Sequence, residues 1–115
     1  MIARFVQDGL AINYRPTETV SAGDIVVLGS LIGIAKLDIA ANTLGALATV
    51  GVFEIDKAAE AVTLGAVLYW DAAEQKVTAT ETGNVYIGKA VTAAEATDEK
   101  VCVLLNAPYV APAAE

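Results

Sequence analysis

Short apolar runs, most of them opened or interrupted by a glycine, recur along the chain. Residues 23–29 and 65–71 each consist of a glycine followed by a run rich in β-branched or aromatic side chains. A glycine followed by such a run is typical of a buried or half-buried strand entered from a tight turn. The chain is therefore predicted to be all-β, as a small internally duplicated β-barrel or β-sandwich with at most one short helix.

The remaining pattern predicts where most of the strands lie. Residues 46–55 predict one longer strand, and because both of its faces are apolar we expect it to be covered on both sides or to face a partner subunit. Residues 56–62 predict the short helix, since apolar and alanine residues recur there at helical spacing. Further strands are predicted at residues 24–28, 31–36, 67–70, 77–80, 85–91 and 100–105. Residues 2–14 predict two short strands or one bent arm, with Asp8 and Gly9 as a turn between the two halves.

Three elements recur in the same order in the two halves of the chain. Residues 23–27 match 65–69 at an offset of 65 − 23 = 42, residues 32–35 match 87–90 at 87 − 32 = 55, and residues 50–53 match 101–104 at 101 − 50 = 51. Unequal offsets place the length differences in loops, where insertions are tolerated. The alternative is a chance match, because the apolar patterns of strands are degenerate.

Length and composition predict a single domain that can bury a core. The chain has 115 residues, of which 56% are hydrophobic and 18% are charged. We expect an N-terminal arm or strand pair over residues 1–15, a β-domain over 16–107 with repeats at about 20–56 and 63–106, and a C-terminal tail over 108–115.

Charge and hydropathy limit the classes of partner. The net charge is −7, which disfavours nucleic acid because its phosphates are neutralised by Lys and Arg. No apolar run approaches the roughly 18 residues of a membrane span, and Gln7 and Asp8 break the apolar start that a signal peptide would need. We expect a soluble protein with neither a nucleic-acid partner nor a membrane partner.

No catalytic, cofactor-binding or metal-binding residue is predicted. The chain has no histidine, and its lone cysteine, Cys102, lies in an apolar run where a small core residue is expected. Glu54 and Asp56 beside Lys57 are expected to be solvated surface charges. The glycine-rich phosphate loop of nucleotide-binding proteins is absent from the sequence.

The aromatic residues leave one ligand-binding possibility open. Tyr69 and Trp70 are neighbours on a predicted strand, where side chains alternate between faces, so we expect Trp70 to be buried and Tyr69 to be exposed. Exposed aromatic side chains can bind sugars or peptides. A carbohydrate- or peptide-binding module that uses Tyr69, Trp70 and Tyr86 is therefore the alternative function.

Taken in order, the motifs resemble a family of small phage and prophage proteins known as capsid cement or decoration proteins, long catalogued as a domain of unknown function. The resemblance covers residues 5–105 and rests on Gly23-Asp24-Ile25-Val26-Val27, Ile32-Gly33-Ile34-Ala35, Gly51-Val52-Phe53-Glu54-Ile55-Asp56-Lys57-Ala58, Gly65-Ala66-Val67-Leu68-Tyr69-Trp70-Asp71 and Tyr86-Ile87-Gly88-Lys89-Ala90. Some family members carry a recombinase label, which the missing phosphate loop and the acidic charge of this chain argue against.

The resemblance implies a non-enzymatic protein, made in the bacterial host cytoplasm, that binds the outer surface of an assembled phage head as a homotrimer. Its partners would be the major capsid protein and further copies of itself, with no cofactor. The residues expected to contact the capsid are Ile2, Arg4, Phe5, Val6, Leu10, Ile12 and Tyr14. The residues expected at the subunit interface are Leu47, Val50, Val52 and Phe53.

Overall fold

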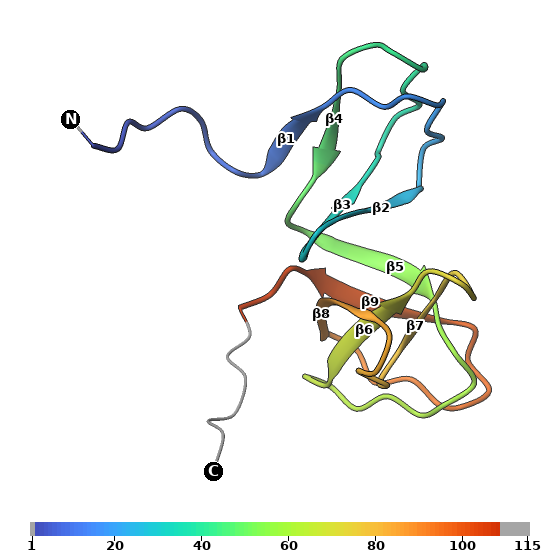
Figure 1. The fold of residues 1–115 in the computed structure, drawn as a ribbon. Helices are drawn as coiled ribbons and strands as arrows, with labels where there is room; N and C mark the ends of the chain where they lie inside the picture. The colour runs from blue at the N-terminus through green and yellow to red at the C-terminus, as the bar shows by residue number, and fades with distance from the viewer. Residues whose placement is uncertain (1, 109–115) are drawn as a thin grey trace.

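In the computed structural model, residues 2–108 are described and form nine β-strands in two antiparallel sheets (Figure 1). The four-stranded sheet has the order β1-β4-β3-β2, with β1 (Ala11–Tyr14), β2 (Ile25–Leu28), β3 (Leu31–Ile34) and β4 (Gly45–Ala48). The five-stranded sheet has the order β5-β9-β8-β6-β7, with β5 (Val52–Asp56), β6 (Val67–Asp71), β7 (Lys76–Thr78), β8 (Val85–Ala90) and β9 (Lys100–Leu105). The predicted all-β class is confirmed.

The five-stranded sheet curls back on itself. Just beyond β5, Lys57 forms a parallel bridge with Val77 of β7, and the Ala58 N–H donates to the Val77 carbonyl at 2.8 Å. These contacts link the two ends of the strand order, so the five strands surround a common interior, seen as the lower unit in Figure 1. The four-stranded sheet stays open, with β1 and β2 at its two edges.

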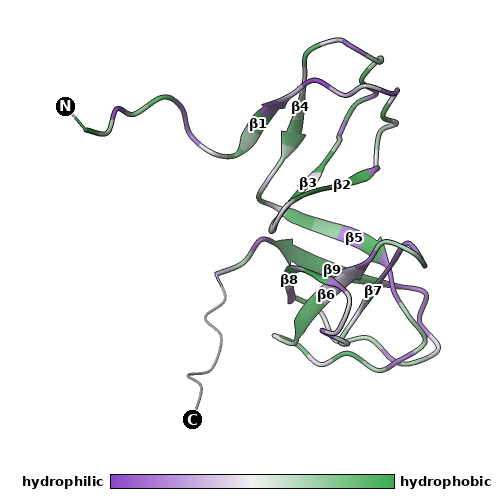
Figure 2. Ribbon diagram, viewed as in Figure 1, coloured by the Kyte–Doolittle hydropathy of each residue, from purple (hydrophilic) through white to green (hydrophobic). Residues whose placement is uncertain are grey.

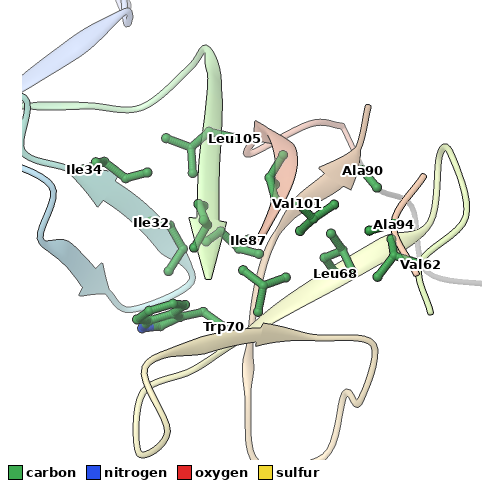
Figure 3. Close-up of a cluster of buried hydrophobic side chains, with 13 residues drawn as sticks. Ile32, Ile34, Val62, Leu68, Trp70, Ile87, Ala90, Ala94, Val101 and Leu105 are labelled. Atoms are coloured by element: carbon green, nitrogen blue, oxygen red, sulfur yellow. The ribbon is translucent and has the colours of Figure 1, made fainter. Parts of the chain in front are cut away.

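One large apolar cluster fills the barrel-like unit, and the open sheet contributes to it. Ile32 and Ile34 of β3 are 0% and 4% exposed and lie in this cluster beside side chains of the five-stranded sheet (Figure 3). A smaller cluster of Val20, Ala35, Ile39 and Leu47 lies within the open sheet and its loops. Most of the buried apolar residues therefore belong to the larger cluster.

Two isolated bridges flank the glycine-led strands at matching positions. Val20 and Ile39 exchange backbone hydrogen bonds of 2.9 and 2.8 Å, and Val62 and Ala94 exchange bonds of 2.7 and 2.8 Å. Val62 follows Val20 by 62 − 20 = 42 residues, and Ala94 follows Ile39 by 94 − 39 = 55 residues. These are the offsets of the first two sequence matches.

The turns that enter β2 and β6 are also built alike. Gly23 donates to the Ala35 carbonyl at 2.6 Å, and Gly65 donates to the Ala90 carbonyl at 2.7 Å. The two glycines have φ values of 93° and 84°, a left-handed conformation that glycine adopts without steric cost. A glycine is thus required at the same place in both units.

A second pair of matching glycines allows close packing. A side chain at Gly33 in β3 would place its Cβ 2.8 Å from the Leu47 Cβ, and one at Gly88 in β8 would place its Cβ 2.1 Å from the Leu104 carbonyl oxygen. Both approaches are closer than van der Waals contact. A larger residue would therefore clash at Gly33 and at Gly88, which explains the glycine in each matched Ile-Gly pair.

Two predicted elements differ from the structure. The predicted strand at residues 46–55 is divided into β4 and β5, which lie in different sheets; the chain changes sheets around Gly51, whose φ is 122°. The helix predicted at residues 56–62 does not form, because Lys57 and Val62 instead bridge to Val77 and Ala94. Within residues 2–108 no helix is long and apolar enough to cross a membrane.

The third sequence correspondence does not follow the pattern of the other two. Residues 50–53 and 101–104 lie in and beside strands that pair with each other, since β5 pairs with β9. In the open sheet it is β4 that lies beside β3, as β9 lies beside β8. The division into arm, repeats and tail stays a prediction, and residues 109–115 of the tail lie outside the described residues.

Asn106 connects the two sheets. It follows β9 with a φ of 52°, and its side-chain amide donates to the carbonyls of Ile32 and Thr49, each at 2.8 Å. Its side-chain oxygen also accepts from the Ile32 N–H at 3.4 Å. One side chain of the barrel-like unit thus satisfies backbone groups of β3 and of the segment that leads into β5.

We predict that Asn106→Gly lowers the free energy of unfolding by about 2–3 kcal/mol, because it leaves two carbonyls without their donor while the backbone conformation is kept. Asn106→Ala is expected to cost about 1 kcal/mol more, since alanine resists a positive φ. The matched control is Asn42→Gly: Asn42 has a φ of 61°, and its side chain makes no hydrogen bond to the described residues. Urea unfolding measures all three, and equal stability of Asn106→Gly and the control would contradict the role of Asn106.

Candidate functional site

The aromatic residues do not form an exposed binding platform. Tyr69 and Trp70 are 7% and 5% exposed, so the prediction that Trp70 is buried is confirmed and the prediction that Tyr69 is exposed is wrong. Both faces of β6 are covered: Trp70 joins the large cluster, and Tyr69 packs edge-on against the half-buried Tyr86, with ring centroids 6.1 Å apart. The Tyr86 hydroxyl donates to the Ala107 carbonyl. The basis for the sugar- or peptide-binding alternative is therefore removed.

Asp71 and Cys102 lie in ordinary structural environments. Asp71 accepts hydrogen bonds of 3.1 Å from the N–H groups of Ala73 and Glu74, as a polar turn does. Cys102 is half-buried and not a core residue, since its neighbours Val101 and Val103 fill the interior face of β9. Within residues 2–108 no group of three or more His, Cys, Asp or Glu side chains is placed to hold a metal ion.

The N-terminal segment is an exposed apolar arm. Residues 2–10 are all exposed. The exposures of Ile2, Phe5, Val6 and Leu10, relative to the same residue in an extended peptide, are 108%, 80%, 73% and 66%. Figure 2 shows apolar and polar residues alternating along this arm, which extends away from both sheets. Large exposed apolar groups gathered on one segment are typical of an interaction site.

The arm is attached to the body at its base. Thr49 donates through its N–H to the Leu10 carbonyl at 3.1 Å and through its hydroxyl to the Gly9 carbonyl. Beyond this point β1 pairs with β4, and Ile12 and Tyr14 are half-buried against the smaller cluster. Of the residues expected to contact the capsid, Ile2, Arg4, Phe5, Val6 and Leu10 are thus free on the surface, while Ile12 and Tyr14 hold the base of the arm.

The residues expected at the subunit interface lie in different environments. Leu47 is 0% exposed in the smaller cluster, so it offers no surface to a partner and leaves this set. Phe53 is half-buried against the large cluster. Val50 and Val52 are 42% and 57% exposed, and Leu104, directly across from Val52 in the ladder, is 38% exposed. Val52 and Leu104 on the outer side of β5 and β9, together with Val50 in the bend just before β5, are therefore taken as one apolar patch.

An apolar hollow of about 440 Å³ lies at the base of the arm. Its lining includes Leu10, Leu37 and Leu44, which are exposed, and the alanines of β4. The sequence does not reveal this hollow, because Leu37 and Leu44 lie in the loop between β3 and β4 and belong to no periodic pattern. The hollow extends the apolar surface of the arm onto the body.

An acidic cleft of about 270 Å³ lies between β2 and β5. Asp24, Glu54 and Asp56 border it, and Phe53 and Trp70 are among its apolar lining residues. Asp24 accepts from the Ser21 N–H at 2.9 Å, and Asp56 pairs with Lys100. Glu54 is exposed and makes no hydrogen bond or ion pair with the residues that the structure describes.

Asp56 and Lys100 form a surface ion pair. The hydrogen bond to Lys100 holds the pKa of Asp56 below its usual range, and the same contact raises the pKa of Lys100. Their side chains are 59% and 51% exposed, so water screens the pair and its contribution to stability is small. Glu54 and Asp56 were predicted to be surface charges, and both are exposed.

Lys57 has a different role from its acidic neighbours. It is 4% exposed, and its ammonium donates to the carbonyls of Ala58, Glu95 and Asp98 at 3.0, 2.9 and 3.0 Å. A buried ammonium is tolerated when all three of its donors are satisfied. Lys57 thereby ties the end of β5 to the loop between β8 and β9, a role that its place in a charged triplet did not reveal.

One family model matches most of the chain. The model, described as phage cement protein, matches residues 6–105. No curated protein and no solved structure matches the chain. The matched range contains both sheets and the base of the arm.

Replacing Lys57 tests whether this buried ammonium organises the loop. Lys57→Met is expected to lower the free energy of unfolding by about 2–4 kcal/mol, because three carbonyls lose their donor. It should also speed hydrogen exchange of the amides in residues 92–99. Lys36→Met is the control, since Lys36 is exposed and has no polar partner among the described residues. Equal stability and exchange in the two variants would show that Lys57 does not hold the loop.

Proposed function

The chain belongs to the phage cement protein family, and on that premise we propose that it is a non-enzymatic decoration protein that binds the outer surface of an assembled head. Membership of this family gives the chain a cement role on the phage capsid. The proposal adds the mode of attachment: a homotrimer whose arms contact the major capsid protein and stabilise the head. The protein would be made in the cytoplasm of the bacterial host.

The exposed arm is the observation that carries the proposal. In a single copy, Ile2, Phe5 and Val6 are largely open to water, although burying an aliphatic or aromatic side chain of this size releases about 1.5–3 kcal/mol. An extended segment of this kind can add a strand to a sheet edge of another protein. The arm therefore supplies a surface that gains free energy only on binding.

A trimer would turn weak contacts into tight attachment. Once the first arm of a trimer has bound, the other two arms are held close to their own sites, which raises their effective concentration there. The patch of Val50, Val52 and Leu104 is the proposed interface between subunits, since it is apolar and exposed and two of its residues lie on paired strands.

The charge of the protein agrees with an outward position. The chain carries 14 acidic and 7 basic residues, and a surface facing packaged DNA would more naturally be basic. The negative body would be repelled from the nucleic acid and is compatible with exposure to solvent. We place the protein on the outer face of the head for this reason.

Removing residues 2–7 tests the arm. The hydrogen bonds of Gly9 and Leu10 are kept and only the exposed one from the Gln7 amide to the Ala11 carbonyl is lost, so the body is expected to fold with nearly unchanged stability in urea. Binding to purified expanded heads, measured by co-sedimentation, is expected to weaken at least about tenfold. Phe5→Ser should weaken it in the same direction, whereas Leu64→Ser, at a residue 70% exposed on the barrel-like unit, should not. Unchanged binding after the truncation would show that the arm is not the capsid contact.

Charging the proposed subunit interface tests the trimer. Val52→Asp places a carboxylate in the apolar patch and next to Glu54, so the concentration at which trimers dissociate is expected to rise at least about tenfold. Light scattering over a dilution series measures this concentration. Leu64→Asp is the control for adding one negative charge at an exposed apolar position. Equal behaviour of the two variants would place the interface elsewhere.

A further inference from the structure

The acidic cleft between β2 and β5 has an unbalanced charge. Asp24, Glu54 and Asp56 border it, while no basic residue of the described chain is among its lining residues. Lys100 pairs with Asp56 and interacts electrostatically with Glu54, but it does not line the cleft. Asp24 and Glu54 thus present two carboxylates to an opening that no basic residue of the described chain lines, and such a site favours a positively charged group.

The floor of the cleft contains an unused hydrogen-bond donor. Trp70 is 5% exposed, and its indole N–H, which stays open to solvent, has no acceptor among the described residues. Figure 3 shows its ring nitrogen at the border of the cluster, turned away from the aliphatic side chains. Trp70 lines the cleft, so this N–H can donate to a carbonyl of a segment that enters there.

The backbone of β5 is also available beside the cleft. β5 is the terminal strand in its sheet order and pairs with β9 along one side, while the bridge to β7 begins only at Lys57. An open strand edge can accept another strand, and charged side chains on such an edge discourage unselective pairing. Glu54 and Asp56 would therefore favour an incoming strand that carries a positive charge.

The N-terminal arm has the matching chemistry. Residues 2–6 are extended, exposed and apolar apart from Arg4. We propose that, in the proposed trimer on which this inference rests, the cleft receives the arm of a neighbouring copy. Arg4 would lie between the carboxylates of Asp24 and Glu54. The guanidinium can bind carboxylates through paired hydrogen bonds, and the aliphatic part of its side chain can cover Phe53.

The geometry favours the arm of another copy over the chain's own arm. The arm leaves the body from β1, and the cleft lies beside β2, at the opposite edge of the same sheet. Figure 1 shows the arm directed away from β5. From Ala11 to Arg4 an extended chain spans roughly 23 Å, which is enough to reach an adjacent subunit.

The same docking leaves side chains free for the head. Neighbouring side chains of an extended segment point in opposite directions, so Phe5 faces away when Arg4 enters the cleft. The cleft also adjoins the proposed subunit patch, since Val52 and Glu54 are two positions apart on one face of β5. An arm crossing from a subunit docked on Val52 would therefore pass the cleft.

Reciprocal charge exchange tests this docking. Arg4→Glu and Glu54→Arg are each expected to raise the trimer dissociation concentration at least about tenfold in light scattering. The double variant Arg4→Glu with Glu54→Arg is expected to recover most of the loss. Glu81→Arg in an exposed turn makes the same charge change as Glu54→Arg at a distant site; it is the matched control and should remain trimeric. A double variant no better than the single variants would overturn the proposal.

Head binding, measured separately by co-sedimentation, distinguishes this proposal from the function itself. If Arg4→Glu weakens head binding but leaves the trimer unchanged, Arg4 contacts the capsid and the docking proposal is wrong while the cement function stands. A wild-type protein that binds heads as a monomer would overturn the docking in the same way. Failure of the wild type to bind heads would instead contradict the proposed function.

A disulfide test separates a neighbouring arm from the chain's own arm. Two proteins are prepared in a Cys102→Ser background, one with Arg4→Cys and one with Glu54→Cys, and are mixed under a mild disulfide oxidant. A disulfide between the two different chains is expected to form faster than either homodimer. A protein carrying both substitutions that closes the bond within one chain, with no mixed product from the separate proteins, would overturn exchange between copies.

Discussion

The packing of β3 against the barrel-like unit is the contact on which the rest of the molecule depends. Ile32 and Ile34 extend from the open sheet into the large cluster, whereas the open sheet's own cluster has only four buried residues. A small sheet with so little buried surface is not stable in water by itself. The side-chain amide of Asn106 holds the backbone of the same strand, so the apolar and polar contacts between the two sheets converge on β3.

The strands that could be predicted from the sequence are those marked by a glycine. Gly23 and Gly65 are needed for a left-handed turn, and Gly33 and Gly88 are needed because another strand lies too close for a Cβ. Each of these glycines therefore has a fixed place at the start of a strand or within it, which made the strands around them predictable. The sequence left residues 2–14 as two short strands or one bent arm, and the structure has an exposed segment over residues 2–10 that leads into β1.

The features that could not be predicted depend on contacts distant in the sequence. Tyr69 was expected on the surface, but the ring of Tyr86 packs against it. Leu47 looked like an interface residue because its strand is apolar on both faces, yet it fills the smaller cluster. Nothing in the sequence distinguishes Lys57 from its charged neighbours, because two of its three carbonyl partners lie in the distant loop between β8 and β9. Periodicity identifies which face is apolar, but not what covers it.

The combination of an apolar arm and an acidic body gives a physical account of selective assembly. Free copies repel each other through their shared negative charge, which limits unselective association of the exposed apolar residues. In the proposed trimer the repulsion would be lowest where Arg4 approaches the carboxylates of Glu54 and Asp24, so the charge that keeps copies apart would also select one way of joining them. Once joined, the arms would be held in fixed positions and would lose less conformational entropy on meeting the capsid. Assembly of the trimer would therefore prepare the arms for binding to the head.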